Sequence, residues 1–389
     1  MPLSKRPYPR LAASILACAL GGLSNAHAAG PDQDAKVRQA VDAAMKPVIE
    51  HYAIPGLAIA VTIDGKRHFI EYGLASKEPE IAVTRDTLFE LGSISKTFTA
   101  TLAAYAEVEG KLSLKDSVSE HMPELKGSAL DAVRLLDLAT HTAGGFPLQL
   151  PDEVKDQKQL IAYFRAWKPR FDPGMHRDYA NPSIGLLGMV TAKAMGASYE
   201  TLVERRLFPE LGLRRSYISV PTTELKSYAW GYNRDGKPVR VSPGMLATEA
   251  YGVKSNAVDM IRFLEVNMGI GTVPGKLARA VDATHIGYFR SGGRIQDLIW
   301  EQYPYPVALD DFVAGNSPKM NSGPVTAIDP PMAPRADVIL NKTGSTNGFG
   351  AYVAYVPEKK IGIVMLANKN YPNDARVKAA HQLLSQLAE

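Results

Sequence analysis

Two β-hairpin patterns, one near each end of the 389-residue chain, limit the folds that this sequence can adopt. Near the start, the β-branched run Leu57–Ile63 is followed by Asp64-Gly65, a hairpin-turn signal, and by a returning strand at Arg67–Tyr72. Near the end, the apolar runs Phe349–Val356 and Ile361–Leu366 flank a short polar turn. Because a hydrophobic sheet face must be buried against other elements, we expect both chain ends to join one sheet.

Helical spacing of apolar residues dominates the rest of the chain. Residues 34–52 place apolar side chains one turn apart, although Pro47 inside this run should kink or interrupt the helix. Residues 377–387 carry an apolar face that predicts a final helix. The middle of the chain, from about 93 to 268, is mostly helical pattern broken by Pro and Gly loops.

The predicted fold class is therefore α/β of the α+β type. We expect a mostly antiparallel sheet built from both chain ends, flanked by helices and interrupted by a helical insertion. The α/β part should comprise residues 29–108 and 310–389, and the helix-rich part residues 109–309, each approximately. With 46% hydrophobic and 22% charged residues, the composition excludes a disordered chain or a collagen-like repeat.

The first 28 residues have the pattern of a secretory signal peptide. Three basic residues lie within the first ten, an apolar stretch covers residues 11–23, and Ala26-His27-Ala28 offers a cleavage site. The apolar stretch is too short for a membrane span, so we expect cleavage, a periplasmic location and no stable membrane association. Cleavage lowers the formal net charge from +4 to +1, which argues against a nucleic-acid partner.

The only cysteine, Cys18, lies inside this apolar stretch. Its surroundings faintly resemble a lipoprotein processing site, which remains the alternative to signal cleavage after Ala28. The mature chain, residues 29–389, then has no thiol for a disulfide, a nucleophile or a metal site. No His/Asp/Glu grouping has metal-ligand spacing, so we expect neither a metal nor a cofactor. His141, the histidine nearest the Gly144-Gly145 turn, is interpreted as structural.

The sequence Ser93-Ile94-Ser95-Lys96 contains the pattern S-x-x-K. Positions three apart share one face of a helix, so Lys96 can reach the Ser93 hydroxyl. A serine becomes a good nucleophile when a neighbouring base takes its proton, and a lysine held neutral by nearby positive charge can serve as that base. The pattern alone is weak, because a chain of this length contains about one match by chance.

Two further patterns follow in the chain. Lys342–Gly344, a K-T-G directly before the C-terminal hairpin, offers an ammonium, a hydroxyl and close backbone access to a ligand carboxylate. Tyr179–Asn181 supplies Y-x-N, a triplet that also occurs at Tyr371–Asn373. Only the first of these two triplets lies between S-x-x-K and K-T-G.

S-x-x-K, Y-x-N and K-T-G in this order resemble the serine β-lactamase and penicillin-binding protein superfamily, specifically class C (AmpC-type) β-lactamases. The resemblance extends over the mature chain and includes the segments Glu249–Ser255 and Leu366–Asn373. Class A enzymes use S-D-N and a separate glutamate base, and this sequence has no S-D-N. The resemblance implies a β-lactamase/transpeptidase-like fold, with the site in a cleft between an α/β part and a helical part.

The resemblance also implies roles for individual residues. Ser93 would be the nucleophile that opens the lactam as an acyl-enzyme, Lys96 and Tyr179 the proton-handling pair, and Asn181 a group that orients them. The backbone N–H groups of Ser93 and Ser345 would form the oxyanion hole. The remaining implied contacts are Lys342, Thr343, Gly344, Asn373 and Arg376 with the substrate carboxylate, and Gln149, Tyr251 and Asn370 as pocket walls.

The implied activity is hydrolysis of the β-lactam amide bond of cephalosporins and penicillins, which gives antibiotic resistance. The partner is then a small-molecule β-lactam, and the protein is expected to be a monomer. Two alternatives remain open: a D-Ala-D-Ala peptidase or esterase of the same superfamily, and a penicillin sensor that stays acylated. Asn341 and Ala247 depart from common family residues and would affect which substrates fit.

Overall fold

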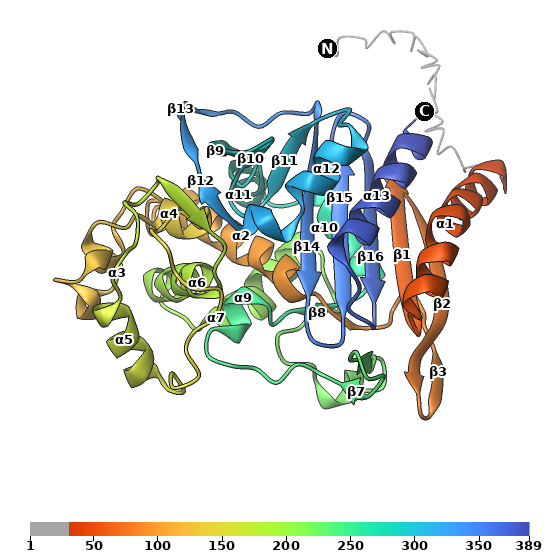
Figure 1. Cartoon of the computed structure of the whole chain (residues 1–389), viewed down its shortest axis with the longest axis horizontal. Coiled ribbons are helices and arrows are strands. Elements are labelled where there is room, and N and C mark those ends of the chain that lie inside the picture. The colour runs from red at the N-terminus through yellow and green to blue at the C-terminus, as the bar shows by residue number, and fades with distance from the viewer. Residues whose placement is uncertain (1–30, 389) are drawn as a thin grey trace, which may run out of the picture.

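A ten-stranded antiparallel sheet forms the centre of the computed structural model, which describes residues 31–388 (Figure 1). The strands lie in the order β13 (Thr326–Met332), β9 (Gly287–Ser291), β10 (Arg294–Gln296), β11 (Glu301–Pro304), β14 (Val338–Ser345), β15 (Gly350–Val356), β16 (Ile361–Ala367), β1 (Gly56–Ile63), β2 (Lys66–Lys77) and β3 (Glu80–Ala82). β1 pairs with both β2 and β16, so the two chain ends meet in the middle of the sheet.

The central strands are buried on both faces, and their side chains alternate between two cores. In β1, Leu57, Ile59 and Val61 point into one core, whereas Ala58 and Ala60 belong to the other. β15 and β16 divide their residues in the same way. This two-residue period is the alternation expected of a strand, and burial on both faces explains why these runs are apolar throughout.

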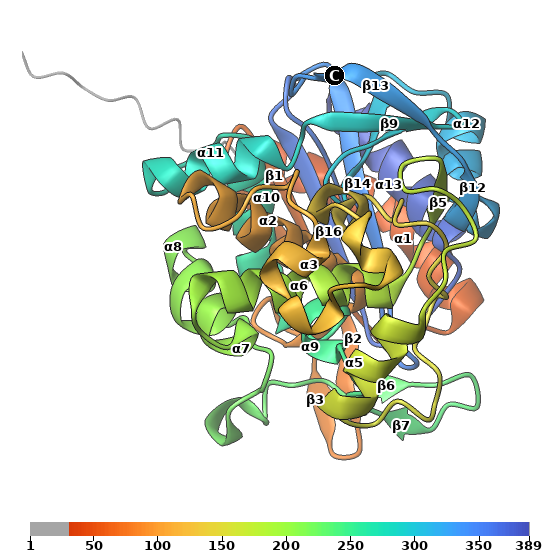
Figure 2. The same cartoon turned by 90° about the vertical axis from the view of Figure 1, so that its left-hand side faces the viewer.

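Helices cover both faces of the sheet (Figures 1 and 2). One core is closed by helices from both ends of the described chain, α1 (Pro31–Tyr52), α12 (Leu309–Gly315) and α13 (Asn373–Leu387). The opposite core contains α2 (Ser95–Val108), α10 (Ala257–Asn267) and α11 (Gly275–Ala283). The second core continues without a break into the helix-rich part, so α2 is shared between the two parts.

The helix-rich part lies beside the sheet and contains α3 (Val118–His121), α4 (Leu135–Ala139), α5 (Gln157–Ala166), α6 (Asn181–Met195), α7 (Tyr199–Leu202), α8 (Phe208–Leu211) and α9 (Ala247–Ala250). Three small ladders tie loops together: β4 (Phe89–Glu90) with β8 (Lys254–Ser255), β5 (His176–Asp178) with β12 (Ser322–Pro324), and β6 (Gly231–Tyr232) with β7 (Pro238–Val239). Phe98 of α2 packs edge-on against Phe208 of α8, with ring centroids 5.1 Å apart. This contact joins the helix-rich part to the core that α2 shares with the sheet.

The fold class and both hairpins predicted from the sequence are confirmed. Asp64 and Gly65 adopt the left-handed backbone that a two-residue hairpin turn requires, with φ of 51° and 82°. The interruption predicted at Pro47 does not occur, because α1 continues through this residue to Tyr52, and a kink there stays a prediction. Packing of α1 against α13 and the sheet compensates for the hydrogen bond that proline cannot donate.

One stretch of the expected helix-rich range, 109–309, instead supplies strands to the large sheet. β9, β10 and β11 lie between residues 287 and 304 and pair with β13 and β14. The sequence pattern missed them because two of these strands are short and bury polar side chains such as Arg294, Gln296 and Glu301. Arg177 of β5 donates hydrogen bonds to Gln296 and Glu301, and Arg294 pairs with Glu301, so polar side chains are buried here and no apolar alternation marks the strands.

The predicted signal peptide, residues 1–28, lies outside the described residues. Within residues 31–388, none of the helices has both the length and the apolar character needed to cross a membrane.

Leu102 provides a test of the shared core. It is fully buried in α2, and truncation to alanine should lower the free energy of unfolding by about 2–5 kcal/mol because a cavity remains. The matched control is Leu309→Ala at the start of α12, where the side chain is 39% exposed and the expected loss is about 0.5 kcal/mol or less. Urea unfolding of both variants measures the difference, and equal losses would contradict the position of α2 in the core.

Candidate active site

Ser93 and Lys96 lie at the start of α2, in the turn where a short 3₁₀ segment, Gly92–Ile94, runs into the helix. The Lys96 ammonium donates a hydrogen bond of 3.0 Å to the Ser93 hydroxyl and one of 2.8 Å to the Ala250 carbonyl. Lys96 is fully buried, whereas the Ser93 side chain borders a cavity. The S-x-x-K spacing therefore brings a buried base into contact with an accessible serine.

The start of α2 lies directly against the end of β14. A side-chain Cβ on Gly92 would lie 2.4 Å from the Ser345 nitrogen, and one on Gly344 would lie 2.0 Å from the Leu91 carbonyl oxygen. Both glycines are needed because no larger residue allows the two backbones to approach so closely. The approach places the backbone of Ser345 next to Ser93, where two N–H groups can face one oxyanion.

Tyr179 lies between β5 and α6 and completes the group around Ser93. Its backbone N–H donates to the Asn321 carbonyl at 2.8 Å, and its buried hydroxyl has no hydrogen bond of normal geometry to another described residue. The ammonium nitrogens of Lys96 and Lys342 each lie 5.1 Å from the centroid of its ring. The Tyr179 phenol, the Lys96 and Lys342 amines and the Ser93 hydroxyl thus form one cluster.

The charges in this group shift the pKa values of its members in the directions that proton transfer requires. Burial, with the charge on Lys342, lowers the pKa of Lys96 to about 8, although Tyr179 opposes the shift. Burial of the Tyr179 phenol opposes its ionisation, but the charges of Lys342 and Lys96 outweigh burial and lower its pKa to about 8. Because the two values coincide, Lys96 and Tyr179 should titrate as a coupled pair.

A cavity of about 190 Å³ opens in front of Ser93. The predicted site residues that line it are Ser93, Tyr179, Lys342, Thr343, Gly344, Ser345 and Asn373. These residues come from the 3₁₀ segment Gly92–Ile94 before α2, the β5–α6 connection, β14 and the start of α13, so the cavity lies where the sheet meets the helix-rich part. Its mixture of an ammonium, hydroxyls and an amide suits a small polar ligand that carries a carboxylate.

Several other predicted residues do not line the cavity, among them Asn181, Gln149, Asn370 and Tyr251. The Asn181 side-chain amide donates to Gln149 at 2.9 Å, so these two residues form a pair beside Tyr179. Asn370 accepts a hydrogen bond of 2.6 Å from Arg376. Tyr251 lines a separate hollow together with Thr248 and Gly252, and its role as a wall of the Ser93 cavity stays a prediction.

The predicted contact between Arg376 and the substrate carboxylate is corrected by the structure. Arg376 is fully buried, and its guanidinium donates to the carbonyls of Gly344 and Ala351 and to the hydroxyl of Ser345. A guanidinium that is enclosed by backbone carbonyls cannot reach a ligand in the cavity. Arg376 instead supports the end of β14, which the sequence could not indicate because burial depends on α13 packing against the sheet.

Sequence reasoning missed a buried ion-pair group behind Tyr179. The Glu301 carboxylate lies 3.2 Å from the Arg177 guanidinium and 3.0 Å from that of Arg294, and all three side chains are nearly inaccessible. Burial alone would raise the pKa of Glu301, but Arg294, Lys342 and Arg177 together lower it. No local motif marks these residues, because they lie on β5, β10 and β11 and meet only in the folded chain.

Sequence reasoning also missed one wall of the cavity, formed by the segment 315–321. Arg177 donates to the carbonyls of Met320 and Asn321, and Arg294 donates to those of Gly315 and Met320. The two buried guanidiniums therefore hold the backbone of this segment in place. The residues of this part of the chain that line the cavity are Asn316, Ser317, Pro318 and Asn321, and the other unpredicted lining residues are Leu148, Arg294 and Glu301.

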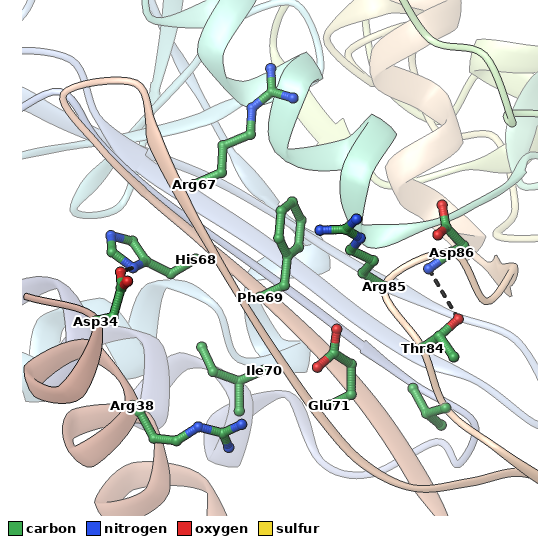
Figure 3. Close-up of a pocket in the computed structure, with 11 residues that line it drawn as sticks. Asp34, Arg38, Arg67, His68, Phe69, Ile70, Glu71, Thr84, Arg85 and Asp86 are labelled. Atoms are coloured by element: carbon green, nitrogen blue, oxygen red, sulfur yellow. Dashed lines mark hydrogen bonds and ion pairs between the residues drawn. The ribbon is translucent and has the colours of Figure 1, made fainter. Parts of the chain in front are cut away.

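A larger hollow of about 630 Å³ lies elsewhere, along β2 and the segment 83–86 beside α1 (Figure 3). Its lining is strongly charged, but Asp34 pairs with Lys66 and His68, and Arg67 pairs with Glu265. It contains neither a serine nor a cysteine, and its floor is broad and open to solvent. It therefore has no counterpart of the Ser93 hydroxyl and the buried Lys96 amine that contacts it. No group of His, Cys, Asp and Glu within residues 31–388 could hold a metal ion.

Comparison with known proteins agrees with the site. The family described as Beta-lactamase matches residues 37–388. A β-lactamase from Pseudomonas fluorescens is 50% identical over 353 residues, which cover 90% of this chain and 99% of that protein. The crystal structure of a class C β-lactamase in complex with cefoxitin is 50% identical, has a TM-score of 0.89, and covers 91% of this chain and 99% of its own.

A third similar protein is described as a β-lactamase/D-alanine carboxypeptidase from Pseudomonas syringae. Its structure is 51% identical, has a TM-score of 0.89, and covers 90% of this chain and 98% of its own. The chain therefore belongs to the β-lactamase family. Its similar structures are class C enzymes, as the order of the three sequence patterns predicted.

Tyr179 should titrate separately from most other tyrosines. We expect Tyr179 to ionise near pH 8, whereas burial raises the pKa values of other buried tyrosines such as Tyr228 and Tyr355. Lys342→Met removes a positive charge that favours the phenolate, so the pKa of Tyr179 should rise towards the free-phenol value of about 10. Tyrosinate absorbance during a pH titration measures both effects. The step near pH 8 should be absent in Tyr179→Phe, and its persistence there would contradict the assignment.

Proposed function

We propose that this β-lactamase opens its substrates through a covalent acyl-enzyme on Ser93. Lys96, with Tyr179, takes the proton of the Ser93 hydroxyl while Oγ attacks the lactam carbonyl carbon. The negative charge on the resulting tetrahedral oxygen is stabilised by the backbone N–H groups of Ser93 and Ser345. As the carbon–nitrogen bond breaks, the leaving lactam nitrogen receives a proton from Tyr179, and the acyl group remains as an ester on Ser93.

Deacylation uses the same proton-transfer group and oxyanion hole as acylation, with water in place of Ser93 as the nucleophile. Tyr179, again as a phenolate, takes a proton from a water molecule whose oxygen attacks the ester carbonyl. The tetrahedral intermediate forms in the same oxyanion hole, and its collapse releases the opened product and returns the proton to Ser93. The positive charges of Lys96 and Lys342 favour the phenolate at both stages.

The observation that carries this proposal is the 3.0 Å hydrogen-bond distance between the Lys96 side-chain nitrogen and the Ser93 hydroxyl, with the Tyr179 ring close to both lysines. Substrate recognition follows from the same cavity. Lys342 and Thr343 would hold the substrate carboxylate together with Asn373, and the Asn181–Gln149 pair would meet the amide of the acyl side chain. Within the β-lactams, we propose cephalosporins and penicillins as the substrates. The proposed reaction uses no cofactor.

A second candidate function, D-Ala-D-Ala carboxypeptidase activity, rests on one observation. A protein that is 51% identical is described as having both activities. A peptide that ends in D-alanine presents a carboxylate next to the scissile amide, as a β-lactam does, so the same cavity could accept it. Release of D-alanine from such a peptide by the purified protein tests this function separately.

The proposal also includes an exported monomer. The first 28 residues have the pattern of a signal peptide, which would direct the mature chain to the periplasm, where it would protect the cell from β-lactam antibiotics. Edman sequencing of the secreted protein and light scattering test the cleavage site and the oligomeric state.

Ser93→Ala should lower the hydrolysis of a cephalosporin and of a penicillin by at least about a thousandfold, because the covalent nucleophile is lost. Mass spectrometry of the wild-type protein mixed with substrate should show one acyl adduct, which Ser93→Ala lacks. The control is Ser95→Ala two residues along, where the buried hydroxyl accepts a hydrogen bond from the Val253 N–H and has no role in the chemistry. A Ser93→Ala protein that keeps a few per cent of activity would contradict the mechanism.

Tyr179→Phe and Lys342→Ala should separate proton transfer from binding. Tyr179→Phe should slow both acylation and deacylation about a hundredfold or more, because it removes the proton-transfer group with little change of shape. At a pH at which Tyr179 is ionised in both proteins, Lys342→Ala should weaken substrate binding about tenfold and affect the chemical steps less. Rapid-mixing kinetics with one cephalosporin resolve these steps. Near wild-type acylation and deacylation by Tyr179→Phe would assign proton transfer to Lys96 alone.

A further inference from the structure

His141 lies in the turn after α4, and three observations connect it with Tyr179. Its imidazole packs on the Tyr179 ring with centroids 4.4 Å apart and an angle of 50° between the planes. The backbone N–H of Asp178 donates to the His141 carbonyl at 2.9 Å, and that of Ala180 donates to the ring nitrogen Nδ1 at 3.3 Å. His141 therefore binds the residue on each side of Tyr179 and contacts Tyr179 itself.

The hydrogen bond from Ala180 determines the protonation state of the His141 ring. A backbone N–H can only donate, so Nδ1 must present its lone pair, and the ring proton must lie on Nε2. A second proton on the ring would occupy Nδ1 and break this hydrogen bond. His141 is therefore a neutral imidazole with the Nε2–H tautomer. This conclusion follows from the geometry alone.

The charges around the ring act in the same direction. Burial lowers the pKa of His141, and four cations add to the shift. The cations come from four elements: Lys96 on α2, Arg177 on β5, Arg294 on β10 and Lys342 on β14. Three carboxylates of the adjoining elements pair with arginines, Asp137 with Arg134, Asp178 with Arg170, and Glu301 with Arg177 and Arg294. Burial raises the pKa of a fourth carboxyl group, that of Asp297 after β10, well above its usual value and so favours its neutral form. None of them is left to stabilise a charged imidazole.

Two features of His141 are unfavourable for stability. Its backbone adopts the left-handed conformation, with φ of 61°, which is uncommon for a residue other than glycine. Its Nε2 is buried and has no hydrogen-bond partner among the described residues. Local strain and unsatisfied polar groups of this kind concentrate at functional sites. The residue is therefore poorly explained as a packing residue of the core.

We propose that His141 is a positioning residue for the reaction: as a neutral imidazole, it holds the backbone on both sides of Tyr179 and keeps the phenol within reach of Lys96 and Lys342. It does not touch the reacting atoms. If the imidazole were charged, it would add a fifth cation to the group and release the N–H of Ala180, directly before Asn181. This inference rests on the role proposed above for Tyr179.

Two variants separate the hydrogen bond from the packing. His141→Phe keeps a ring against Tyr179 and removes the acceptor for the Ala180 N–H. His141→Asn keeps an oxygen close to the position of Nδ1, and asparagine tolerates the left-handed backbone. The control is His285→Phe, which removes a second fully buried histidine, bonded to Tyr355 and far along the chain from the site residues.

We expect kcat of His141→Phe for a cephalosporin to fall about 10- to 100-fold with KM changed less than about threefold, because small displacements of a proton-transfer group slow the chemical step. The acid limb of kcat/KM should move about one pH unit upward, because a displaced Tyr179 feels less of the charge that lowers its pKa. His141→Asn should keep most of the wild-type kcat, and the acid limb of its kcat/KM profile should lie at the wild-type pH. His285→Phe should lower the melting temperature and leave the limb unchanged.

The ring itself is tested by NMR of the wild-type protein. The nitrogen shifts of His141 should show the Nε2–H tautomer at neutral pH and no protonation over the range in which the enzyme is active. A protonated ring at neutral pH, an unchanged acid limb in His141→Phe, or an Asn variant as slow as the Phe variant would each overturn the proposal. If Tyr179→Phe reacts like the wild type, the role of Tyr179 fails first. If Tyr179→Phe is slow but the His141 variants react like the wild type, the inference about His141 fails while the role of Tyr179 stands.

Discussion

The structure concentrates buried positive charge around one tyrosine. Lys96, Lys342, Arg177 and Arg294 are all nearly inaccessible to solvent, and one carboxylate, that of Glu301, lies among them. Buried charges without partners are costly, so such a group persists only where the surrounding structure enforces it. Its effect is to favour the charged form of Tyr179 and the neutral form of Lys96, which are the forms that proton transfer from a serine requires.

The fold enforces this group from several directions. The close contacts of Gly92 and Gly344 bring α2 and β14 together, so that Lys96 and Lys342 approach Tyr179 from two sides. Arg376 supports the end of β14 from the opposite face of the sheet. Displacement of any one element would leave a charge buried without its neighbours, which explains why the site is built at the junction of two cores rather than on a loop.

Much of the architecture follows from local patterns. The hairpin turn at Asp64-Gly65, the apolar runs of the central strands and the amphipathic final helix each carry enough signal to be recognised alone. The chemistry-bearing residues Ser93, Lys96, Tyr179 and Lys342 were recognisable for a different reason, because they lie in short motifs whose order resembles a known family. Spacing within one turn of helix was sufficient only for the first pair.

The sequence alone therefore determined the two hairpins near the chain ends, since a hairpin depends on neighbours a few positions apart, and it predicted the reactive residues through the resemblance to a known family. Tertiary structure decided the rest. Arg376 supports β14, Glu301 pairs with buried arginines, and His141 packs against Tyr179. All three contacts exist because strands and helices far apart in sequence pack together. Burial and net local charge are sums over all neighbours in space, and they set the pKa values on which the reaction depends.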